Sequence, residues 1–367
     1  MSDRTRPLPS GTSDALESAR LPSNFGLFFH RYLGYFRSEE DLANWAGIER
    51  NEQDLWKTLE DISGMIFRRK GDYSTHKALQ QQHARYDHIL DLRRQRWGSG
   101  SGCHIEAVVA WRLLIGLSAP SVLNNGITLH PLFGFPYLPA SGIKGLLRRF
   151  RLTEIAEEVG VRPLAPRRIE ERDGDSPWQQ LNDLLLMPEP ETSEEQAQME
   201  ERFKRLREDM DGVVERLREE RRDEDGNLET EPFGGVTCGL DGLRDLSTSY
   251  RRAFGSPNRQ GRVHILDALP ETLVVDGKSL LERDVVTPHY REYYTGDEPP
   301  ADYHDPVPVQ MLAVRQGTTF VFRMTCPDGQ LLSEVQGWLE RAVERWGAGA
   351  RTQAGYGELI VQESDAA

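Results

Sequence analysis

Apolar positions recur along the chain with two different periods, one typical of helices and the other of strands. The clearest helical face runs from 331 to 346 and consists of apolar residues three and four apart: Leu331, Leu332, Val335, Trp338, Leu339, Ala342, Val343 and Trp346. Runs rich in β-branched and other apolar residues predict strands within 105–117, 262–267, 309–324 and 357–361. The third run contains a turn at Gly317 and therefore predicts two strands.

The segment 129–150 predicts a loop followed by a helix. Pro131, Pro136 and Pro139 fix their own φ and restrict the residues before them, so 129–140 should be irregular and apolar. Ser141 is a plausible N-cap of the helix that follows. The apolar face of that helix consists of Ile143, Leu146, Leu147 and Phe150.

The opposite face of this helix is basic. Lys144, Arg148 and Arg151 follow one another at intervals of four and three, with no acid between them. Such a row is either a solvated helix face or a surface that binds an anion. The glycine-rich segment near the end of the chain, described below, favours the second interpretation.

These elements give the order strand, helix, strand, strand, helix, strand. That order is the split βαβ plan of ferredoxin-like and RRM folds, whose sheet often serves as a nucleic-acid platform. We therefore expect an α+β fold.

The segment 192–231 predicts a charged helix with a narrow apolar seam. Its apolar residues are spaced four and three apart, as in a heptad repeat: Met199, Phe203, Leu206, Met210, Val213 and Leu217. So narrow a stripe does not make a core by itself. The helix either packs on a neighbouring helix or projects toward another subunit. We interpret about 154–232 as an insertion into the core fold.

The first part of the chain predicts a separate, mostly helical extension. Residues 1–23 are polar and are expected to be disordered, and 37–64 carries an intermittent apolar stripe. The run Trp-Gly-Ser-Gly-Ser-Gly over 97–102 is typical of a linker. The expected domains are therefore an extension over 1–96 and a core over 97–367.

Composition limits the function classes. The formal net charge of −14 counts against a free-standing nucleic-acid binder unless its cations are concentrated on one surface. Cys103, Cys238 and Cys326 are far apart and odd in number, which argues against a disulfide framework or a zinc site and fits a reducing cytoplasm. We expect no metal and no cofactor. No membrane contact is expected, because no apolar run approaches the roughly 20 residues of a membrane helix.

A glycine-rich loop, 347–357, lies between the last expected helix and the last expected strand. It is not a dinucleotide loop, which needs the order strand, loop, helix, and it lacks the Gly-Lys-Ser/Thr of a P-loop. Its backbone N–H groups, with Arg351 and Thr352, are candidates for an anion-binding concavity, and Tyr356 offers a face for base stacking. The alternative is a tight helix-to-strand turn that uses glycine for positive φ.

Together, the loop and the proline-rich segment form a specific combination. The pattern Gly-x-Gly-x-x-Thr-x-x-Gly-x-Gly over 347–357 is paired with Phe-Pro-Tyr-Leu-Pro-x-Ser-x-Ile-Lys-Gly-x-x-Arg over 135–148. This pair resembles the RAMP superfamily of CRISPR ribonucleoproteins, and within it the sixth-subunit family of the type III-B Cmr effector complex. Further matching segments occur in the family's order: 114–131, 254–255, 263–270, 284–294 and 302–308. The resemblance covers 97–363, and Ala140-Ser-Gly142 departs from the family's usual pattern.

The resemblance implies a ferredoxin-like, RRM-like core and a non-catalytic backbone subunit near the 3′ end of a guide RNA. It implies contacts with guide and target RNA, with other Cmr RAMP subunits and with a small helical subunit. The residues expected to bind RNA are Lys144, Arg148, Arg151, Arg259, Gly347, Gly349, Arg351, Thr352 and Tyr356. Those expected to bind a protein partner are the seam residues Met199, Phe203, Leu206 and Met210.

Two other function classes stay open. Related RAMP subunits cleave RNA with a loop aspartate or with histidine acid/base chemistry. The candidates for that chemistry in this chain are His130, His264, His289, His304, Asp284, Asp302 and Asp305. The third class is an interaction scaffold built on the seam helix, which would leave Lys144 and Arg351 without a role.

Overall fold

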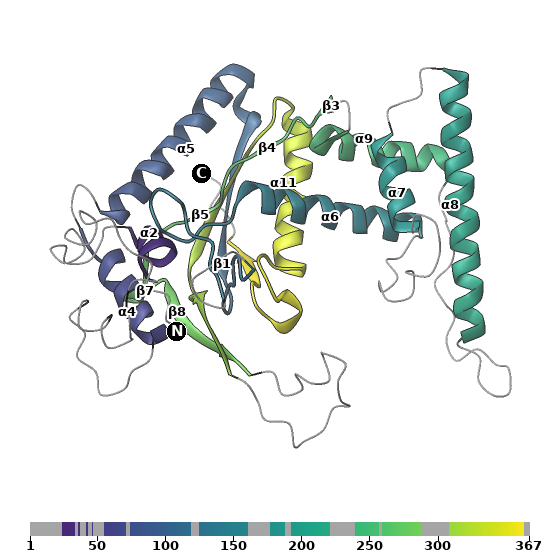
Figure 1. The fold of residues 1–367 in the computed structure, drawn as a ribbon. Helices are drawn as coiled ribbons and strands as arrows, with labels where there is room; N and C mark the ends of the chain where they lie inside the picture. The colour runs from purple at the N-terminus through teal and green to yellow at the C-terminus, as the bar shows by residue number, and fades with distance from the viewer. Residues whose placement is uncertain are drawn as a thin grey trace.

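The computed structural model describes residues 24–33, 36, 42, 46, 55–70, 74–118, 125–160, 177–187, 192–220, 239–256, 259–287 and 308–362. Figure 1 shows a sheet with helices on both of its faces and a group of helices that extends away from it. None of the helices in these ranges is long and apolar enough to span a membrane.

The main sheet is antiparallel and is built from segments far apart in the chain. Its spatial order is β11 (Leu359–Val361), β1 (Gly102–Val109), β10 (Thr319–Thr325) and β4 (His264–Ile265), and β5 (Leu269–Pro270) also pairs with β10. The long pairing of β1 with β10 sets Ile105 opposite Phe322 and His104 opposite Arg323. The expected mixed α and β fold is confirmed.

Strand alternation directs the two faces of β1 toward different helices. Ile105, Ala107 and Val109 are buried on the face covered by α6 (Ala140–Val159) and α11 (Gly329–Arg345). Helix α11 follows its predicted apolar pattern, and Asp328 caps it by accepting a hydrogen bond from the Leu331 N–H at 3.1 Å.

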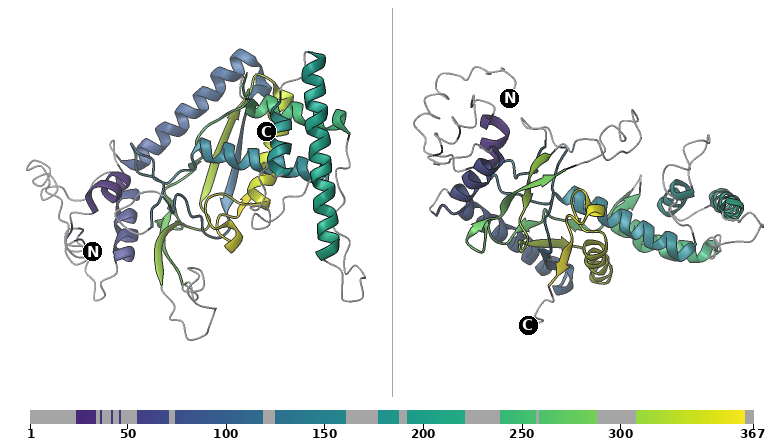
Figure 2. Two further views of the ribbon diagram at one scale, coloured as in Figure 1. Left: turned by 45° about the vertical axis from the view of Figure 1, so that its right-hand side comes forward. Right: turned by 90° about the horizontal axis from the view of Figure 1, so that it is seen from below.

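The other face of the sheet is covered by α5 (Thr75–Trp97), so it is not an open platform (Figure 2). The Ser74 hydroxyl caps α5 by accepting from the Lys77 N–H at 3.2 Å. Helix α5 is polar, and it joins the sheet through charge: the Arg323 guanidinium of β10 donates to Asp87 at 2.7 Å. The sequence did not predict that this helix lies on the sheet, because its buried apolar residues, Leu79 and Leu90, are too few to form a regular apolar face.

The connector between α5 and β1 is a tight corner, so its interpretation as a plain linker is wrong. Ser99–Ser101 forms a 3-10 turn, η3, in which Ser101 is buried. The Ser101 hydroxyl donates to the carbonyls of Arg93 at 3.1 Å and Gly98 at 2.7 Å, while its own carbonyl accepts from the Cys326 N–H at 2.9 Å. Serine turns the chain here by bonding to nearby backbone.

Helix α6 begins at Ala140, and the expected Ser141 cap is wrong. Pro139 precedes the helix in an extended conformation and supplies no side-chain cap. The cap comes from far along the chain, since the Asp267 carboxylate accepts from the Ala140 N–H at 2.7 Å.

Three further expectations differ from the structure. The first strand ends at Val109, after which Leu113 and Leu114 form only isolated bridges to Val314 and Ala350. The region from Asp284 begins within a strand, because β8 (Leu281–Val286) pairs with β9 (Val309–Val314) in a hairpin. Helix α9 (Leu240–Phe254) occupies a segment from which no helix was predicted.

Beyond the sheet, α6 leads to α7 (Pro177–Leu186), α8 (Ser193–Glu220) and α9 (Figure 1). Thr192 and Glu195 form a reciprocal capping box at the start of α8, with both hydrogen bonds 3.2 Å long. The seam of α8 packs against α7, so packing on a neighbouring helix is the observed alternative within this chain.

The remaining elements are short or lie toward the N-terminus. The short elements are α2 (Phe25–Leu27), η1 (Phe28–Tyr32), η5 (Thr352–Ala354) and two ribbons, β2 (Gly255–Ser256) with β3 (Arg259–Gln260) and β6 (Val274–Val275) with β7 (Lys278–Ser279). Helix α4 (Leu55–Phe67) contacts β7, β8 and β9. Phe25, Phe28 and Phe67 share one hydrophobic core with the sheet, whereas the domain boundary at residue 97 stays a prediction.

The cap of α6 gives a direct stability test. Asp267→Ala should lower the free energy of unfolding by about 1 kcal/mol, because the Ala140 N–H loses its acceptor. Ser141→Ala, at an exposed position of the same helix turn, should change it by less than about 0.5 kcal/mol. Urea denaturation measures both variants, and a larger loss for Ser141→Ala would contradict the assigned cap.

Candidate nucleic-acid interface

The basic row on α6 is divided among different partners. Lys144 is half-buried and forms no ion pair with any residue that the structure describes. Arg148 is exposed, and its guanidinium donates to the Tyr250 hydroxyl at 3.1 Å and more weakly to Asn182 at 3.4 Å. Both of those partners are neutral, so neither of them compensates the positive charge of Arg148.

Arg151 is bound within the chain. Its guanidinium lies 3.3 Å from Glu154 and 3.1 Å from Glu158, and it stacks over the Trp338 ring at 5.2 Å. Burial raises the pKa of Glu154, but Arg341 and Arg151 outweigh it and hold that pKa below its usual value. Glu154 and Glu158 thus lie one and two helical turns after Arg151, and they largely compensate its charge.

The structure adds two other basic groups to Lys144. Thr325 of β10 pairs with both Gly102 and His264, and Ser101, next to Gly102, bonds to the Arg93 carbonyl. The end of α5 therefore lies beside β4, on which the start of α6 also packs. Burial, followed by the charges of Arg93 and Lys144, lowers the pKa of His264.

We name Arg93, Lys144 and His264 the basic cluster. All three side chains are half-buried, and they come from α5, α6 and β4. Arg93 also stacks over the Trp97 ring at 4.7 Å, which places an aromatic surface beside the cations. Sequence reasoning missed Arg93 because it stands before a segment that looked like a linker.

Arg259 is a further cation, located a few residues before β4 in the chain. It lies on the exposed β2–β3 ribbon, and three residues, 261–263, separate that ribbon from β4. Strand β2 needs glycine at position 255, because a Cβ there would lie 2.5 Å from the Arg259 carbonyl oxygen. Arg262, in the connection, is also exposed.

The glycine-rich loop uses much of its backbone to hold itself in place. The N–H groups of Ala348, Ala350 and Gly357 donate to carbonyls of Gly357, Leu114 and Arg112 at 2.7 to 2.8 Å. Gly347 and Gly349 have positive φ, and a Cβ at Gly349 would lie 2.3 Å from the Leu114 carbonyl oxygen. These glycines serve the tight helix-to-strand turn.

The outer end of the loop keeps its polar groups accessible. Arg351 is exposed in the left-handed conformation with φ 58°, and Thr352 beside it is half-buried. An anion site at this loop is therefore restricted to Arg351, Thr352 and the turn around them.

Tyr356 is held by a carboxylate. Its hydroxyl donates to Asp284 at 2.7 Å, and burial together with this contact raises the pKa of Tyr356 to about 12. The ring also packs against a small cluster of Leu114, Met311 and Ala313. A base could stack only on the part of the ring that these contacts leave exposed.

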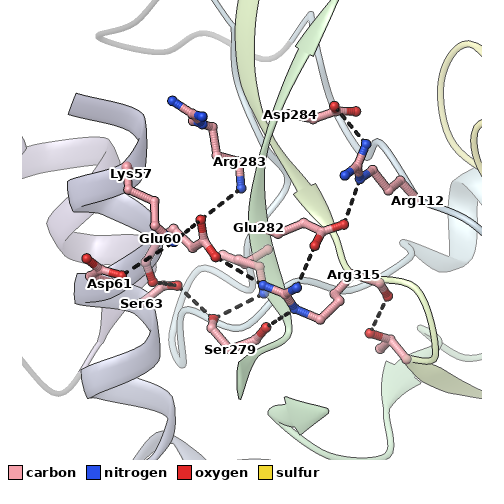
Figure 3. A network of polar contacts seen from close by, with 12 residues as sticks. Lys57, Glu60, Asp61, Ser63, Arg112, Ser279, Glu282, Arg283, Asp284 and Arg315 are labelled. Atoms are coloured by element: carbon pink, nitrogen blue, oxygen red, sulfur yellow. Dashed lines mark hydrogen bonds and ion pairs between the residues drawn. The ribbon is translucent and has the colours of Figure 1, made fainter. Parts of the chain in front are cut away.

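Asp284 belongs to a charge network that links the loop to the β8–β9 hairpin and α4 (Figure 3). Arg112 donates to Asp284 at 2.9 Å and to Glu282 at 2.7 Å. Arg315 joins Glu282 at 2.6 Å to Glu60 of α4 at 3.0 Å. The expectation of Asp284 as a loop residue is wrong, because it is buried in a strand and its carboxylate accepts hydrogen bonds from Arg112, Tyr356 and the Val285 N–H.

The other catalytic candidates lie apart. His130 stacks on Phe133 with centroids 4.7 Å apart, and burial lowers its pKa. His264 belongs to the basic cluster. His289, His304, Asp302 and Asp305 lie outside the described residues. Among the residues that are described, no group of three His, Cys, Asp or Glu side chains is arranged to hold a metal ion.

The seam residues expected at a protein interface are covered by the chain itself. Met199, Phe203, Leu206 and Met210 are each less than 10% exposed. A partner would reach these four side chains only if α8 left α7. The outer face of α8 is accessible instead, as Lys204, 76% exposed, illustrates.

The Tyr356 contact gives a second stability test. Tyr356→Phe should lower the free energy of unfolding by about 1.5 to 3 kcal/mol, because the variant has no hydroxyl to donate to the charged Asp284 carboxylate. Tyr86→Phe is the matched control, since the Tyr86 hydroxyl reaches Asp267 only at 3.4 Å. Thermal or urea unfolding that ranked Tyr86→Phe as the more damaging change would contradict the described network.

Comparisons relate the chain to several known proteins. It is 28% identical over 253 residues to the CRISPR system Cmr subunit Cmr6 of Pyrococcus furiosus, a match that covers 68% of this chain and 65% of that protein. The chain thus spans just under two thirds of the length of this curated relative.

Three solved structures of CRISPR assemblies or subunits match the chain, each with a TM-score below 0.5. A type III-B Cmr-beta complex bound to cognate target RNA contains a chain 18% identical, with 96% of this chain and 88% of that chain covered and a TM-score of 0.47. Cmr6 from Pyrococcus furiosus is 23% identical, with 71% and 98% covered and a TM-score of 0.38. A type IV-B CRISPR complex contains a chain 13% identical, with 72% and 92% covered and a TM-score of 0.34.

A family model, described as the RAMP superfamily, matches residues 97–360, which is most of the chain. The match includes β1, α6, the glycine-rich loop and two of the three members of the basic cluster. The chain belongs to the RAMP superfamily.

Proposed function

We propose that this chain is a non-catalytic, RNA-binding backbone subunit of a type III-B CRISPR effector complex in the cytoplasm, active in antiviral defence. In this role it holds the guide RNA near its 3′ end, and it contacts the target RNA where that RNA pairs with the guide. The similarity to the Cmr6 subunit of Pyrococcus furiosus supports the kind of complex. The observation that carries RNA binding is the convergence of Arg93, Lys144 and His264.

The fold assignment that accompanies this function is a ferredoxin-like core. The chain order β1, α6, β4, β10, α11, β11 matches the split βαβ plan, and the spatial order β11, β1, β10, β4 supports it. In this assignment α5 is an addition on the second face of the sheet. RNA is then held at the end of the sheet where α5, α6 and β4 meet, instead of across its face.

The electrostatics suit a grip on the RNA backbone. The chain carries a net charge of −14, so phosphate binding depends on cations concentrated in one place. Lys144 has no compensating acid among the described residues, and the pKa of His264 is lowered first by burial and then by the charges of Arg93 and Lys144. Phosphate contacts of this kind position RNA without reading its sequence.

Protein partners are assigned to the helical projection. Helices α7, α8 and α9 extend away from the sheet (Figure 2), and α8 presents a long charged surface. Neighbouring RAMP subunits and a small helical subunit are the proposed partners for this projection and for the sheet edges. The buried seam keeps the projection rigid by packing α8 on α7.

The absence of catalysis is part of the proposal. Asp284 already binds Arg112 and Tyr356, and His130 is enclosed by aromatic rings. A RAMP endoribonuclease that uses His264 is the alternative, because that histidine lies beside two cations. Incubation of guide RNA with the protein distinguishes the two, since a nuclease would shorten the RNA and His264→Gln would abolish the shortening.

Charge removal within the basic cluster tests RNA binding. Lys144→Gln should weaken binding to a single-stranded RNA several-fold and reduce the slope of log affinity against log salt by about 0.7, the loss of one phosphate contact. Lys204→Gln, on the distant and exposed face of α8, is the matched control and should change neither quantity. Fluorescence anisotropy measures both quantities. If Lys144→Gln and Lys204→Gln changed the affinity and the salt slope equally, the basic cluster would not be part of the RNA interface.

The pH dependence of binding tests His264. Its pKa is lowered in the free protein, and a bound phosphate would raise it again, so binding takes up a proton. Affinity for RNA should therefore rise as the pH falls from about 7.5 toward 6, the range around the ordinary histidine pKa. His264→Gln should flatten this dependence, and a variant that retains the full slope would show that another group titrates.

A further inference from the structure

A cleft of about 390 Å³ lies between α5 and the sheet face opposite α6 and α11. Its walls include apolar surface from Leu90 and Val321 and polar groups from both elements. The alternation of β1 directs His104 and Glu106 into it, and their partners across the ladder are Arg323 and Val321. The cleft thus lies where an open sheet of this plan would receive RNA bases.

A buried guanidinium in the cleft wall has hydrogen-bonding capacity left over. Arg323 is 5% exposed, and its Nε donates to Asp87 at 2.7 Å while its Nη2 lies 3.0 Å from His83 Nδ1. His83 Nε2 lies 2.9 Å from the Pro270 carbonyl oxygen and must donate to it, so Nδ1 is the acceptor. Within the described chain, Arg323 Nη1 has no acceptor.

The cleft also holds two free acceptors. Asp87 is occupied by Arg323, and Asp91 lies 3.4 Å from Arg94. The side chains of Glu106 and Glu271 line the cleft, and neither carboxylate forms a hydrogen bond or ion pair with a described residue, although both residues are bonded through their backbone. The cleft wall therefore contains one buried, unsatisfied donor, and two carboxylates and an apolar surface lie around it.

These groups select the chemistry of the ligand. A phosphate is disfavoured, because four carboxylates line the cleft against two guanidinium groups. A simple cation would leave Arg323 Nη1 without an acceptor. A nucleobase satisfies both requirements, and guanine fits best: its O6 accepts from Arg323 Nη1, while its N1–H and amino group donate to a carboxylate. Its flat faces suit the contacts with Leu90 and Val321.

The cleft adjoins the basic cluster. Arg94 lines the cleft, and Arg93, the next residue of α5, belongs to the cluster. An RNA strand whose phosphates contact the cluster passes the mouth of the cleft. We propose that this cleft binds one unpaired guanine base of the RNA held by the basic cluster, an inference that rests on the proposed function.

The test compares short single-stranded RNAs that differ at one base, with binding to the purified full chain measured by fluorescence anisotropy. An oligonucleotide with one guanine in an otherwise uracil sequence should bind about tenfold more tightly than the same oligonucleotide with adenine, which lacks O6 and presents an amino group in its place. Inosine, which lacks the 2-amino group, should fall between the two.

Two variants locate the preference in the cleft. Glu106→Gln keeps the side-chain shape and should reduce the guanine preference to about twofold or less. His104→Trp places a bulky, strand-compatible residue at an exposed position of the cleft and should abolish the preference by blocking entry. Lys144→Gln should weaken binding of all the oligonucleotides alike and preserve the preference.

The outcomes separate this inference from the function on which it rests. Equal binding of guanine and adenine oligonucleotides by the unaltered protein, or an undiminished preference in Glu106→Gln, would overturn the cleft assignment. Loss of affinity in Lys144→Gln alongside either result would leave the proposed function standing. If Lys144→Gln also left the affinity for RNA unchanged, that result would contradict the proposed function itself.

Discussion

The pairing of β1 with β10 is the constraint on which the rest of the structure depends. Its register directs Ile105 and Phe322 toward α6 and α11, and His104 and Arg323 toward α5. The ion pair between Arg323 and Asp87 then joins a polar helix to the second face of the sheet. An uncompensated arginine at that buried position would be costly, so α5 and the sheet stabilise each other.

In the proposed function, this arrangement determines where RNA is held. Because α5 covers the second face of the sheet, the basic cluster lies at the end of the sheet where α5, α6 and β4 converge, and the covered face keeps a cleft. The glycine-rich loop lies elsewhere and is tied to β8 through Tyr356 and Asp284. Its contribution is a rigid turn with Arg351 exposed at the outer end.

The sequence predicted the elements whose determinants are local. Helix α11 has a regular apolar face and its own Asp328 cap, and the turn at Gly317 has positive φ between β9 and β10. The interactions that sequence reasoning missed are between distant residues. Asp267 caps α6 from 127 positions away, and the charge of Arg93 acts on His264 because β10 pairs with both β1 and β4. Polar residues of β8 looked irregular because they face a charge network.

The central claim is that RNA contacts the meeting point of α5, α6 and β4. Ultraviolet crosslinking of the complex purified with its co-expressed subunits and guide RNA, followed by mass spectrometry of the protein–RNA adducts, tests it most directly. We expect crosslinks on peptides that contain Trp97, Lys144 or His264, and none on the outer face of α8. Crosslinks confined to α8, or recovery of the chain without RNA, would contradict it.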